Sequence, residues 1–286
     1  MNKNSHTPLF LEQIITLLRE RHADKVIDCT FGEGGHGLNL AKLGYTVLGI
    51  EWDKEMFDVG QHNIKEAKTE KVKLTLGNYK DVAVIARENH FDPVDAIIFD
   101  LGLSMYQLEH SSRGFSSQRQ GDLDLRISLL LRESAKDWLN RTSRDELTDL
   151  ITRYVEDKRS TILSRKLLQV REKKPFTKLD DLRKVIMQIT DDEKEATKLL
   201  RQTLQALRIV VNDEMNNIKQ GFSGGLTVLK KDGLLIFLTY HSLEDRLVKR
   251  LGQASRSELK PVQKVIMNKD YPFARSGKLR IYEKIN

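Results

Sequence analysis

The fold of this chain can be predicted from the segment Val26-Ile27-Asp28-Cys29-Thr30-Phe31-Gly32-Glu33-Gly34-Gly35-His36-Gly37. Its first five residues are predicted to form a short buried strand, because they are mostly apolar and end at a glycine cluster. The glycines lack a Cβ atom, so they allow tight turns and a close approach of the backbone to a ligand. A short helix is expected over residues 38–43, closed by Gly44, and a second strand over residues 45–50, with Glu51 at its carboxyl end.

Strand, glycine turn, helix, strand and acid are the parts of a nucleotide-binding cradle. From Gly32 to Glu51 is 19 positions, close to the roughly 20 residues expected of that motif. In such a cradle the glycine amides and the helix N-terminus contact the ligand, and the carboxylate accepts hydrogen bonds from ribose hydroxyls. The alternative is a glycine-rich turn that binds nothing. The motif by itself fits a nicotinamide dinucleotide as well as S-adenosylmethionine.

The alternation of helix and strand continues as far as Asp100. Helices are predicted over residues 54–68 and 81–89, and strands over residues 72–76 and 94–99. This rhythm is typical of an α/β fold with a mostly parallel, doubly wound sheet.

The alternation stops between residues 109 and 205, where we predict helices only. They are expected over residues 125–139, 144–154, 158–170 and 179–188, and from about Asp192. The α/β pattern then returns, with helices over residues 204–218 and 226–229 and strands over residues 234–239 and 278–283. We therefore expect a discontinuous core, residues 1–108 and 206–286, interrupted by a helical insertion domain, residues 109–205.

Length and composition indicate a soluble globular protein. The 286 residues are 39% hydrophobic and 31% charged, and no apolar run approaches the roughly 18 residues that a membrane span needs. The chain opens without a signal peptide, and its single cysteine, Cys29, excludes a disulfide framework, so a cytoplasmic location is expected. Cys29 lies inside the first strand and is predicted to be a core residue. Without a spaced Cys/His cluster, we expect no metal site.

The net charge of +7 is concentrated in two regions. Residues 158–174 contain seven basic residues against one acid, and residues 246–286 contain eleven against three. A solvated charged face explains part of this excess. The rest of the chain has 30 basic residues against 37 acids, so the positive charge is confined to these two regions. They favour a phosphate-bearing partner, so we expect the protein to bind nucleic acid.

Asp100 begins the segment Asp100-Leu101-Gly102-Leu103-Ser104, at the end of the fourth strand. Ligands of open α/β sheets bind at the carboxyl ends of the strands. An enzyme that acts on an amine needs an acceptor at such a place, because the nitrogen must present its lone pair and then shed a proton. The alternative is that Asp100 only caps the turn.

Two histidines also lie near predicted strand ends. His241, in Tyr240-His241-Ser242, follows the strand over residues 234–239 and fits a catalytic base, a phosphate contact or a structural histidine. His36, inside the glycine turn, is expected to shape the cofactor pocket rather than to titrate in catalysis.

Short blocks, in order along nearly the whole chain, carry a family resemblance. They are His6-Thr7-Pro8, Asp28 to His36, Asp100 to Ser104 with Gln107-Leu108, Arg113 to Ser116, Asp122 to Arg126, Gln205 to Ile209, Val211 to Glu214, His241 to Arg246 and Ala274 to Arg280. With these blocks the chain resembles the RsmH (MraW) family. Its members are bacterial S-adenosylmethionine-dependent methyltransferases that act on the exocyclic N4 amine of a cytosine in small-subunit ribosomal RNA.

The resemblance implies a class I methyltransferase core, a helical insertion that helps to form the RNA site, S-adenosylmethionine as cofactor and the small ribosomal subunit as partner. The implied cofactor contacts are Gly34, Gly35, His36, Glu51, Tyr79, Asp100 and Gln107. The catalytic candidates are Asp100, Ser104 and His241. The candidate RNA contacts are Tyr106, Arg165, Lys166, Lys173, Lys174, Arg275 and Lys278.

The chain departs from the family pattern at several of these positions. Glu51 stands where the family usually has Asp, and Tyr79 where it usually has Phe. Met105-Tyr106 replaces Ser-Pro beside the catalytic strand. Tyr106 is therefore predicted either to stack on an extruded cytosine or to pack against the helical insertion.

Other functions fit parts of the sequence. A non-catalytic RNA-binding or ribosome-assembly factor that retains the cofactor pocket is the alternative. A nicotinamide dehydrogenase fits the glycine turn but neither the basic regions nor the end of the fourth strand. Carbon methylation of cytosine through a thiolate is disfavoured, because the only thiol precedes the glycine turn. The sequence leaves the oligomeric state open between a monomer and a homodimer.

Overall fold

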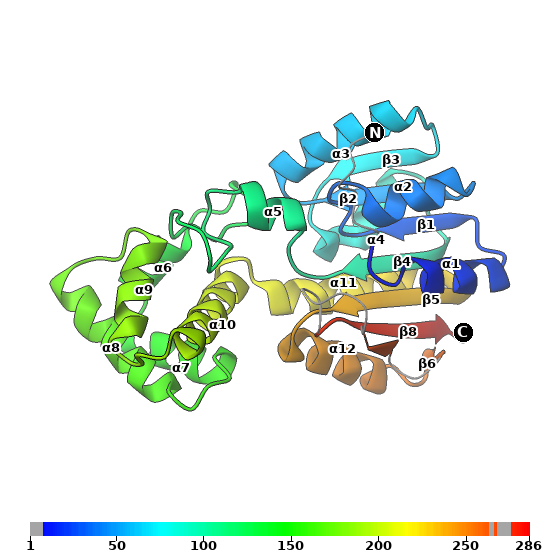
Figure 1. The fold of residues 1–286 in the computed structure, drawn as a ribbon. Coiled ribbons are helices and arrows are strands. Elements are labelled where there is room, and N and C mark those ends of the chain that lie inside the picture. The colour runs from blue at the N-terminus through cyan, green and yellow to red at the C-terminus, as the bar shows by residue number, and fades with distance from the viewer. Residues whose placement is uncertain (1–7, 263–265, 268–275) are drawn as a thin grey trace. The chain divides into compact units, whose positions relative to one another are not determined.

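The computed structural model describes residues 8–262, 266–267 and 276–286, and the chain divides into two compact units (Figure 1). The first unit comprises residues 1–102 and 215–286, and the second comprises residues 103–214. The insertion that we expect at residues 109–205 lies within the second unit. No helix in the described ranges is long and apolar enough to cross a membrane.

The first unit is built on one mixed sheet. Its strands, among the described residues, follow the order β3-β2-β1-β4-β5-β8-β6, and β7 also pairs with β8. Strands β1 to β5 are parallel, and β8 is antiparallel to β5. The bounds are β1 Lys25–Asp28, β2 Thr46–Glu51, β3 Val72–Leu76, β4 Val94–Asp100, β5 Leu229–Thr239, β6 Leu259–Pro261, β7 Ile266–Met267 and β8 Lys278–Lys284. This order confirms the predicted α/β fold with a mostly parallel, doubly wound sheet.

Helices cover both faces of this sheet (Figure 1). They are α1 Leu11–Glu20, α2 Gly35–Lys42, α3 Lys54–Ala67, α4 Val82–Glu88, α11 Glu214–Val228 and α12 Ser242–Ala254, with a short 3-10 helix, η1, over Tyr79–Asp81. Alternate side chains of β4 point to opposite faces. Ile97 and Phe99 are buried with residues of α4, α11 and α12, whereas Ala96 and Ile98 are buried with residues of α1 and α2. Burial on both faces explains why this strand is a continuous apolar run.

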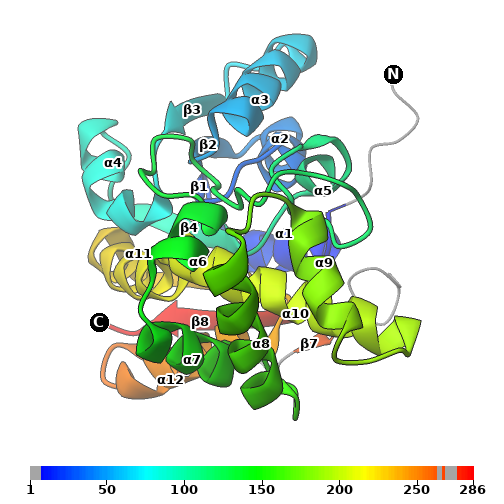
Figure 2. The ribbon, with the colours of Figure 1, turned by 90° about the vertical axis from the view of Figure 1, so that its left-hand side faces the viewer.

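The second unit is helical and has a hydrophobic core of its own. Its helices are α5 Met105–His110, α6 Ala135–Arg141, α7 Arg144–Tyr154, α8 Ser160–Lys173, α9 Leu179–Met187 and α10 Glu193–Val211. Leu147 of α7, Leu163 of α8 and Leu199 of α10 are fully buried in that core. Figure 2 shows α7 beside α8, the pair of helices with the most extensive packing in this unit.

Two helix predictions are wrong, and one helix of the second unit was not predicted. Residues 125–134 are not helical, because Leu125 has a left-handed backbone (φ 58°) and α6 begins only after the capping box of Ser134. The predicted helix over residues 204–218 is two helices, since Asp213 (φ 51°) interrupts it between α10 and α11. The helix α5 was not expected from the sequence.

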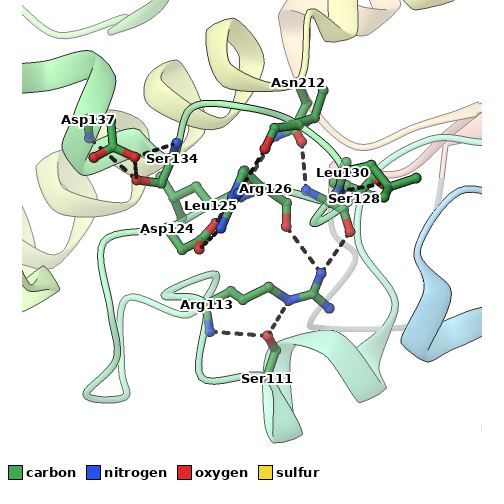
Figure 3. Close-up of polar contacts among 12 residues, drawn as sticks. Ser111, Arg113, Asp124, Leu125, Arg126, Ser128, Leu130, Ser134, Asp137 and Asn212 are labelled. Atoms are coloured by element: carbon green, nitrogen blue, oxygen red, sulfur yellow. Dashed lines mark hydrogen bonds and ion pairs between the residues drawn. The ribbon is translucent and has the colours of Figure 1, made fainter. Parts of the chain in front are cut away.

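The segment between α5 and α6, residues 111–134, is held by side chains rather than by regular structure (Figure 3). Arg113 donates to two carbonyl oxygens of the segment, at 3.2 and 2.7 Å. Arg126 forms a bidentate pair with Asp124, with both N–O distances at 2.8 Å. Asn212, at the end of α10, accepts one backbone N–H of the segment at 2.6 Å and donates to one of its carbonyls at 2.8 Å. These contacts give an irregular segment one defined conformation.

Asn212→Ala is expected to destabilise the second unit by about 2–4 kcal/mol. The side chain is 1% exposed, and its loss leaves a part-buried N–H and a buried carbonyl without their bonds, each costing about 1–3 kcal/mol. Urea unfolding followed by the fluorescence of Trp138, in a background with Trp52→Phe, measures the change. Gln169→Ala, at an exposed position of α8, is the matched control. A loss in Asn212→Ala no larger than the ~0.5 kcal/mol of a surface substitution would contradict this role.

Candidate active site

The glycine turn joins the end of β1 to the start of α2. Asp28, 1% exposed, accepts the backbone N–H of Gly37 at 3.0 Å and that of Thr30 at 3.3 Å. Burial raises the pKa of Asp28 to about 6, and the neighbouring His36 and the two amides oppose that rise. A buried carboxyl at the end of β1 thus fixes the first turn of α2.

Two glycines of this turn are required by its geometry. Gly34 has φ +90°, and a Cβ atom there would lie 2.7 Å from Leu38 Cδ1. A Cβ atom at Gly37 would lie 2.5 Å from the Phe31 ring. Gly34 is also the N-cap residue of α2 and provides no side-chain cap. The N-terminus of this helix therefore suits an anionic ligand group, such as the carboxylate of an amino acid.

Glu51 lies at the carboxyl end of β2, as predicted, and is 9% exposed. Its Oε2 accepts the N–H of Gly32 at 2.8 Å, and its Oε1 accepts the N–H of Asp53 at 2.7 Å. Burial raises the pKa of Glu51 to about 7, and these two amides oppose the rise. Each carboxylate oxygen can accept a second hydrogen bond. The residue is therefore oriented by the protein and retains capacity for the hydroxyls of a ribose.

Asp100 lies at the carboxyl end of β4, with its side chain 26% exposed. Its Oδ1 accepts the hydroxyl of Tyr240 at 2.6 Å, and its Oδ2 lies 3.6 Å from His36 Nδ1. Burial raises the pKa of Asp100, while His36 and the Tyr240 hydroxyl lower it. In the described part of the chain, Tyr240, directly after β5, binds this carboxylate, and His36 of α2 faces it. That arrangement differs from a carboxylate that only caps its own turn.

Tyr79 begins η1, directly after β3. Its ring meets the Phe99 ring edge-on, with centroids 5.7 Å apart and an angle of 86°. The ring also packs over Gly221, where a Cβ atom would lie 2.9 Å from Tyr79 Cδ2. The position, at the same sheet edge as Glu51, is compatible with the predicted cofactor contact.

Ser104 and Gln107 belong to the second unit and cap α5 together. Ser104 Oγ accepts the N–H of Gln107 at 3.1 Å, and Gln107 Oε1 accepts the N–H of Ser104 at 3.0 Å. Both side chains thus have a structural role at the start of this helix. The catalytic role of Ser104 and the cofactor contact of Gln107 stay predictions.

His241 is the N-cap residue of α12, and its side chain is 14% exposed. Its Nδ1 accepts the N–H of Glu244 at 3.3 Å, and its Nε2 lies 3.0 Å from Glu244 Oε1. These contacts give the histidine a structural role. Its catalytic role stays a prediction.

Tyr106 lies in α5 and stacks on His110, one turn later in the same helix. The ring centroids are 4.4 Å apart, with an angle of 29° between the planes. His110 is exposed and Tyr106 is half-buried. The contact is with its own helix, and stacking on an RNA base stays a prediction.

The predicted RNA contacts of α8 and its C-terminal end are mostly on the surface. Arg165, Lys173 and Lys174 are exposed and Lys166 is half-exposed. Lys174 Nζ lies 3.7 Å from a carboxylate oxygen of Asp181. These four cations remain candidates for phosphate contacts.

Two other basic residues of the stretch 158–174 are structural. Arg159 pairs with Asp157 and with Glu195, at 2.7 Å in each case. Arg171 donates to the backbone carbonyls of Leu139 and Thr142, at 2.8 and 2.7 Å. The count of basic residues therefore overstates the charge that this stretch presents to a partner.

The two predicted RNA contacts near the C-terminus differ from those of α8. Lys278 Nζ pairs with Asp245 at 2.8 Å, and Arg280 binds the other oxygen of the same carboxylate at 2.5 Å. Lys278 is therefore partly neutralised by α12. Arg275 lies outside the described residues.

Sequence reasoning missed two residues of this site. Tyr240 was noted only as the neighbour of His241, although its hydroxyl is the one that binds Asp100. Thr30 accepts the N–H of Asp100 at 2.8 Å through Oγ1 and so ties the end of β4 to the end of β1. Both residues directly follow strands that end at the same edge of the sheet. Their position after a predicted strand could have marked them as candidates for the site.

Comparison with known proteins extends over nearly the whole chain. The model of the MraW methylase family matches residues 3–285. A ribosomal RNA small subunit methyltransferase H from Thermosipho africanus is 32% identical, over 99% of this chain and 99% of its own length. The protein of that name from Dictyoglomus turgidum is 34% identical, over 98% and 97%, and the one from Deinococcus radiodurans is 34% identical, over 98% and 90%.

Among solved structures, an rRNA methylase from Streptococcus thermophilus is similar, with a TM-score of 0.48 and 11% identity over 100% of this chain and 99% of that chain. This likeness is too distant to bear on function. The sequence relatives all exceed 30% identity over at least nine-tenths of both chains. With the family match over residues 3–285, they show that the chain belongs to the MraW methylase family.

Proposed function

We propose that this protein transfers a methyl group from S-adenosylmethionine to the N4 amine of a cytosine in the ribosomal RNA of the small subunit. The observation that carries the proposal is the family match over residues 3–285, which includes the sheet edge and the helical second unit. The relatives that match over full length are named for methylation of small-subunit ribosomal RNA. The protein then works in the cytoplasm, on the small ribosomal subunit or its RNA.

The residues at the sheet edge fit this cofactor. Glu51 accepts hydrogen bonds from the ribose hydroxyls, and the N-terminus of α2 at Gly34 and Gly35 receives the methionine carboxylate. Tyr79 lines the same edge, after β3. When bound, S-adenosylmethionine supplies a methyl group on a positively charged sulfonium. Three carboxyls at this edge, the buried Asp28 and Glu51 and the half-buried Asp100, favour a cationic ligand.

Asp100 accepts a hydrogen bond from the amine of the cytosine. The amine of cytosine is conjugated with its ring, so its lone pair must be turned toward the methyl group and its proton must have an acceptor. Because the methyl group moves in line between two atoms, most of the rate enhancement comes from positioning. The target base must leave its stack to reach the carboxylate, at a cost of a few kcal/mol.

The second unit supplies contacts to the RNA backbone. The exposed cations of α8 and its end bind phosphates and hold the RNA without reading its sequence. Tyr106 adds an aromatic face for a base.

A non-catalytic assembly factor is the competing function, since it would keep both the cofactor pocket and the RNA contacts. Mass spectrometry of ribosomal RNA from a deletion strain distinguishes the two. Loss of one methyl group on a cytosine amine, restored by the wild-type gene, is expected. An unchanged pattern of modification with a defect in subunit assembly would favour the assembly factor.

The affinity for S-adenosylmethionine is expected to depend on Glu51 and on pH. The raised pKa of Glu51, about 7, means that the carboxylate forms as the pH rises through 7 and accepts ribose bonds more strongly. Glu51→Gln should bind about 1–1.5 kcal/mol more weakly than wild type at pH 8, with the difference vanishing near pH 5.5. Titration calorimetry of both proteins at each pH measures this. The amino group of the ligand titrates equally in both, so equal affinities of the two proteins at both pH values would remove Glu51 from the site.

Asp100→Asn is expected to retain the fold and lose most methyl transfer. The amide keeps the shape of the carboxylate but cannot take a proton, and a positioned acid or base typically contributes about 10²–10⁴-fold. Single-turnover methylation with saturating RNA and cofactor measures the loss. A rate equal to that of wild type would assign Asp100 a purely structural role.

Reversing Arg165 and Lys166 together to Glu should weaken RNA binding. For each phosphate that the variant no longer binds, the slope of log affinity against log salt should fall by roughly 0.7–0.9. The matched control reverses Lys42 and Lys65, two exposed lysines of the first unit, and should leave the slope unchanged. Equal slopes in wild type and in the Arg165/Lys166 variant would exclude α8 from RNA binding.

A further inference from the structure

One side chain binds an oxygen of the Asp100 carboxylate and another faces its second oxygen. The hydroxyl of Tyr240 donates to Oδ1 at 2.6 Å, a short bond to a charged acceptor. His36, which is 4% exposed, places Nδ1 at 3.6 Å from Oδ2. The three residues come from the end of β5, the start of α2 and the end of β4.

The backbone fixes the tautomer of His36. Its Nε2 lies 3.1 Å from the carbonyl oxygen of Leu9. A carbonyl oxygen only accepts, so Nε2 must carry a hydrogen and donate it. In neutral His36 the lone pair is therefore on Nδ1, the nitrogen that faces Asp100.

In neutral His36, Nδ1 is an acceptor, and it faces the acceptor Oδ2 of Asp100 at 3.6 Å. The lone pair of Nδ1 and the anionic Oδ2 repel each other unless a proton lies between them. The arrangement is consequently a place where one additional proton is stabilised. Among the residues that the structure describes, the other charged groups that act on Asp100 are Asp28, buried at the end of β1, and Glu244, buried in the first turn of α12.

We propose that Tyr240, Asp100 and His36 form one unit that accepts the proton released by the cytosine amine, with Tyr240 and His36 as positioning residues. This rests on the proposed function of Asp100 as the acceptor for the amine. Tyr240 occupies Oδ1 and so directs Oδ2 toward the proton. His36 lies behind Oδ2 and stabilises the proton once it has arrived.

The atoms balance in a single displacement. The lone pair of the amine nitrogen forms the new N–CH3 bond while the S–CH3 bond breaks, and the electron pair of that bond stays on sulfur as a neutral thioether. The nitrogen, now positively charged, gives one N–H proton to Asp100 Oδ2, where it is shared with His36 Nδ1. This proton passes to water after the product has left, so no oxidant or other reactant is needed.

Tyr240→Phe tests the unit through its pH profile. Loss of the hydroxyl removes a bond that stabilises the carboxylate, so the acid limb of the single-turnover rate should move to higher pH by about one unit. On the shifted acid limb the rate should fall several-fold below that of wild type, and it should recover as the pH rises. Tyr282→Phe, which removes a buried hydroxyl bound to the Val248 carbonyl at 3.3 Å, is the matched control and should leave the limb in place.

His36→Gln is the second variant, because Gln keeps a donor for the Leu9 carbonyl but has no Nδ1. The rate at pH 7 should fall about tenfold, with the melting temperature close to that of wild type. Nitrogen NMR of His36 in the ligand-free protein gives a readout that is independent of activity. It should show hydrogen on Nε2 in wild type, and Tyr240→Phe should raise the pH at which the Asp100 carboxyl titrates in carbon NMR.

The outcomes separate this inference from the proposed function. If Asp100→Asn is inactive while Tyr240→Phe and His36→Gln keep the wild-type rate and pH profile, the unit is wrong and Asp100 acts alone. If Asp100→Asn itself is active, the proposed role of Asp100 fails first. If both positioning variants lose cofactor affinity at an unchanged single-turnover rate, the unit serves the ammonium group of the cofactor instead, which overturns the proposal.

Discussion

The hydrogen bond from the N–H of Gly37 to the buried carboxyl of Asp28 is the contact on which the site depends. It joins the end of β1 to the first turn of α2 across a turn that only glycine can form at Gly34. Because His36 directly precedes Gly37, the same bond sets where the imidazole lies. The position of His36 beside Asp100 follows from a contact made on the next residue along the chain.

The sheet edge combines this turn with three other strand ends. In a parallel sheet the carboxyl ends of neighbouring strands lie at one edge, so Asp28, Glu51 and Asp100 meet although 72 positions separate the first from the last. Burial raises the pKa of all three. Backbone amides hold Asp28 and Glu51, and side chains hold Asp100. Each carboxyl is therefore oriented before a ligand binds, and this edge of the sheet favours a cationic ligand or an additional proton.

In the second unit, polar side chains stabilise the structure and do not form a row of carboxyls at a sheet edge. Its leucine core makes it compact, and buried polar side chains define the conformation of the long segment before α6. Arg113 is one of these side chains. Arg159 and Arg171 make internal contacts elsewhere in the unit, while Arg165 and Lys173 face solvent. The same residue type thus has two functions within one helix, and only its contacts distinguish them.

The fold class, and the edge of the sheet that carries the site, could be predicted from the amino-acid sequence alone. Short apolar or alternating runs and the glycine turn depend only on neighbouring residues. The strands β1 to β4 and the position of Glu51 could therefore be predicted from the sequence. The end of α10 was not predictable. Asp213 interrupts the helix there, and the preceding Asn212 bonds to a segment more than 80 positions away. Residues 125–134 resembled a helix by composition, but Arg113 and Asn212 hold their backbone in another conformation. That Tyr240, 140 positions from Asp100, binds its carboxylate is visible only in the folded chain, because a hydrogen bond between two strand ends leaves no periodic signal in either strand.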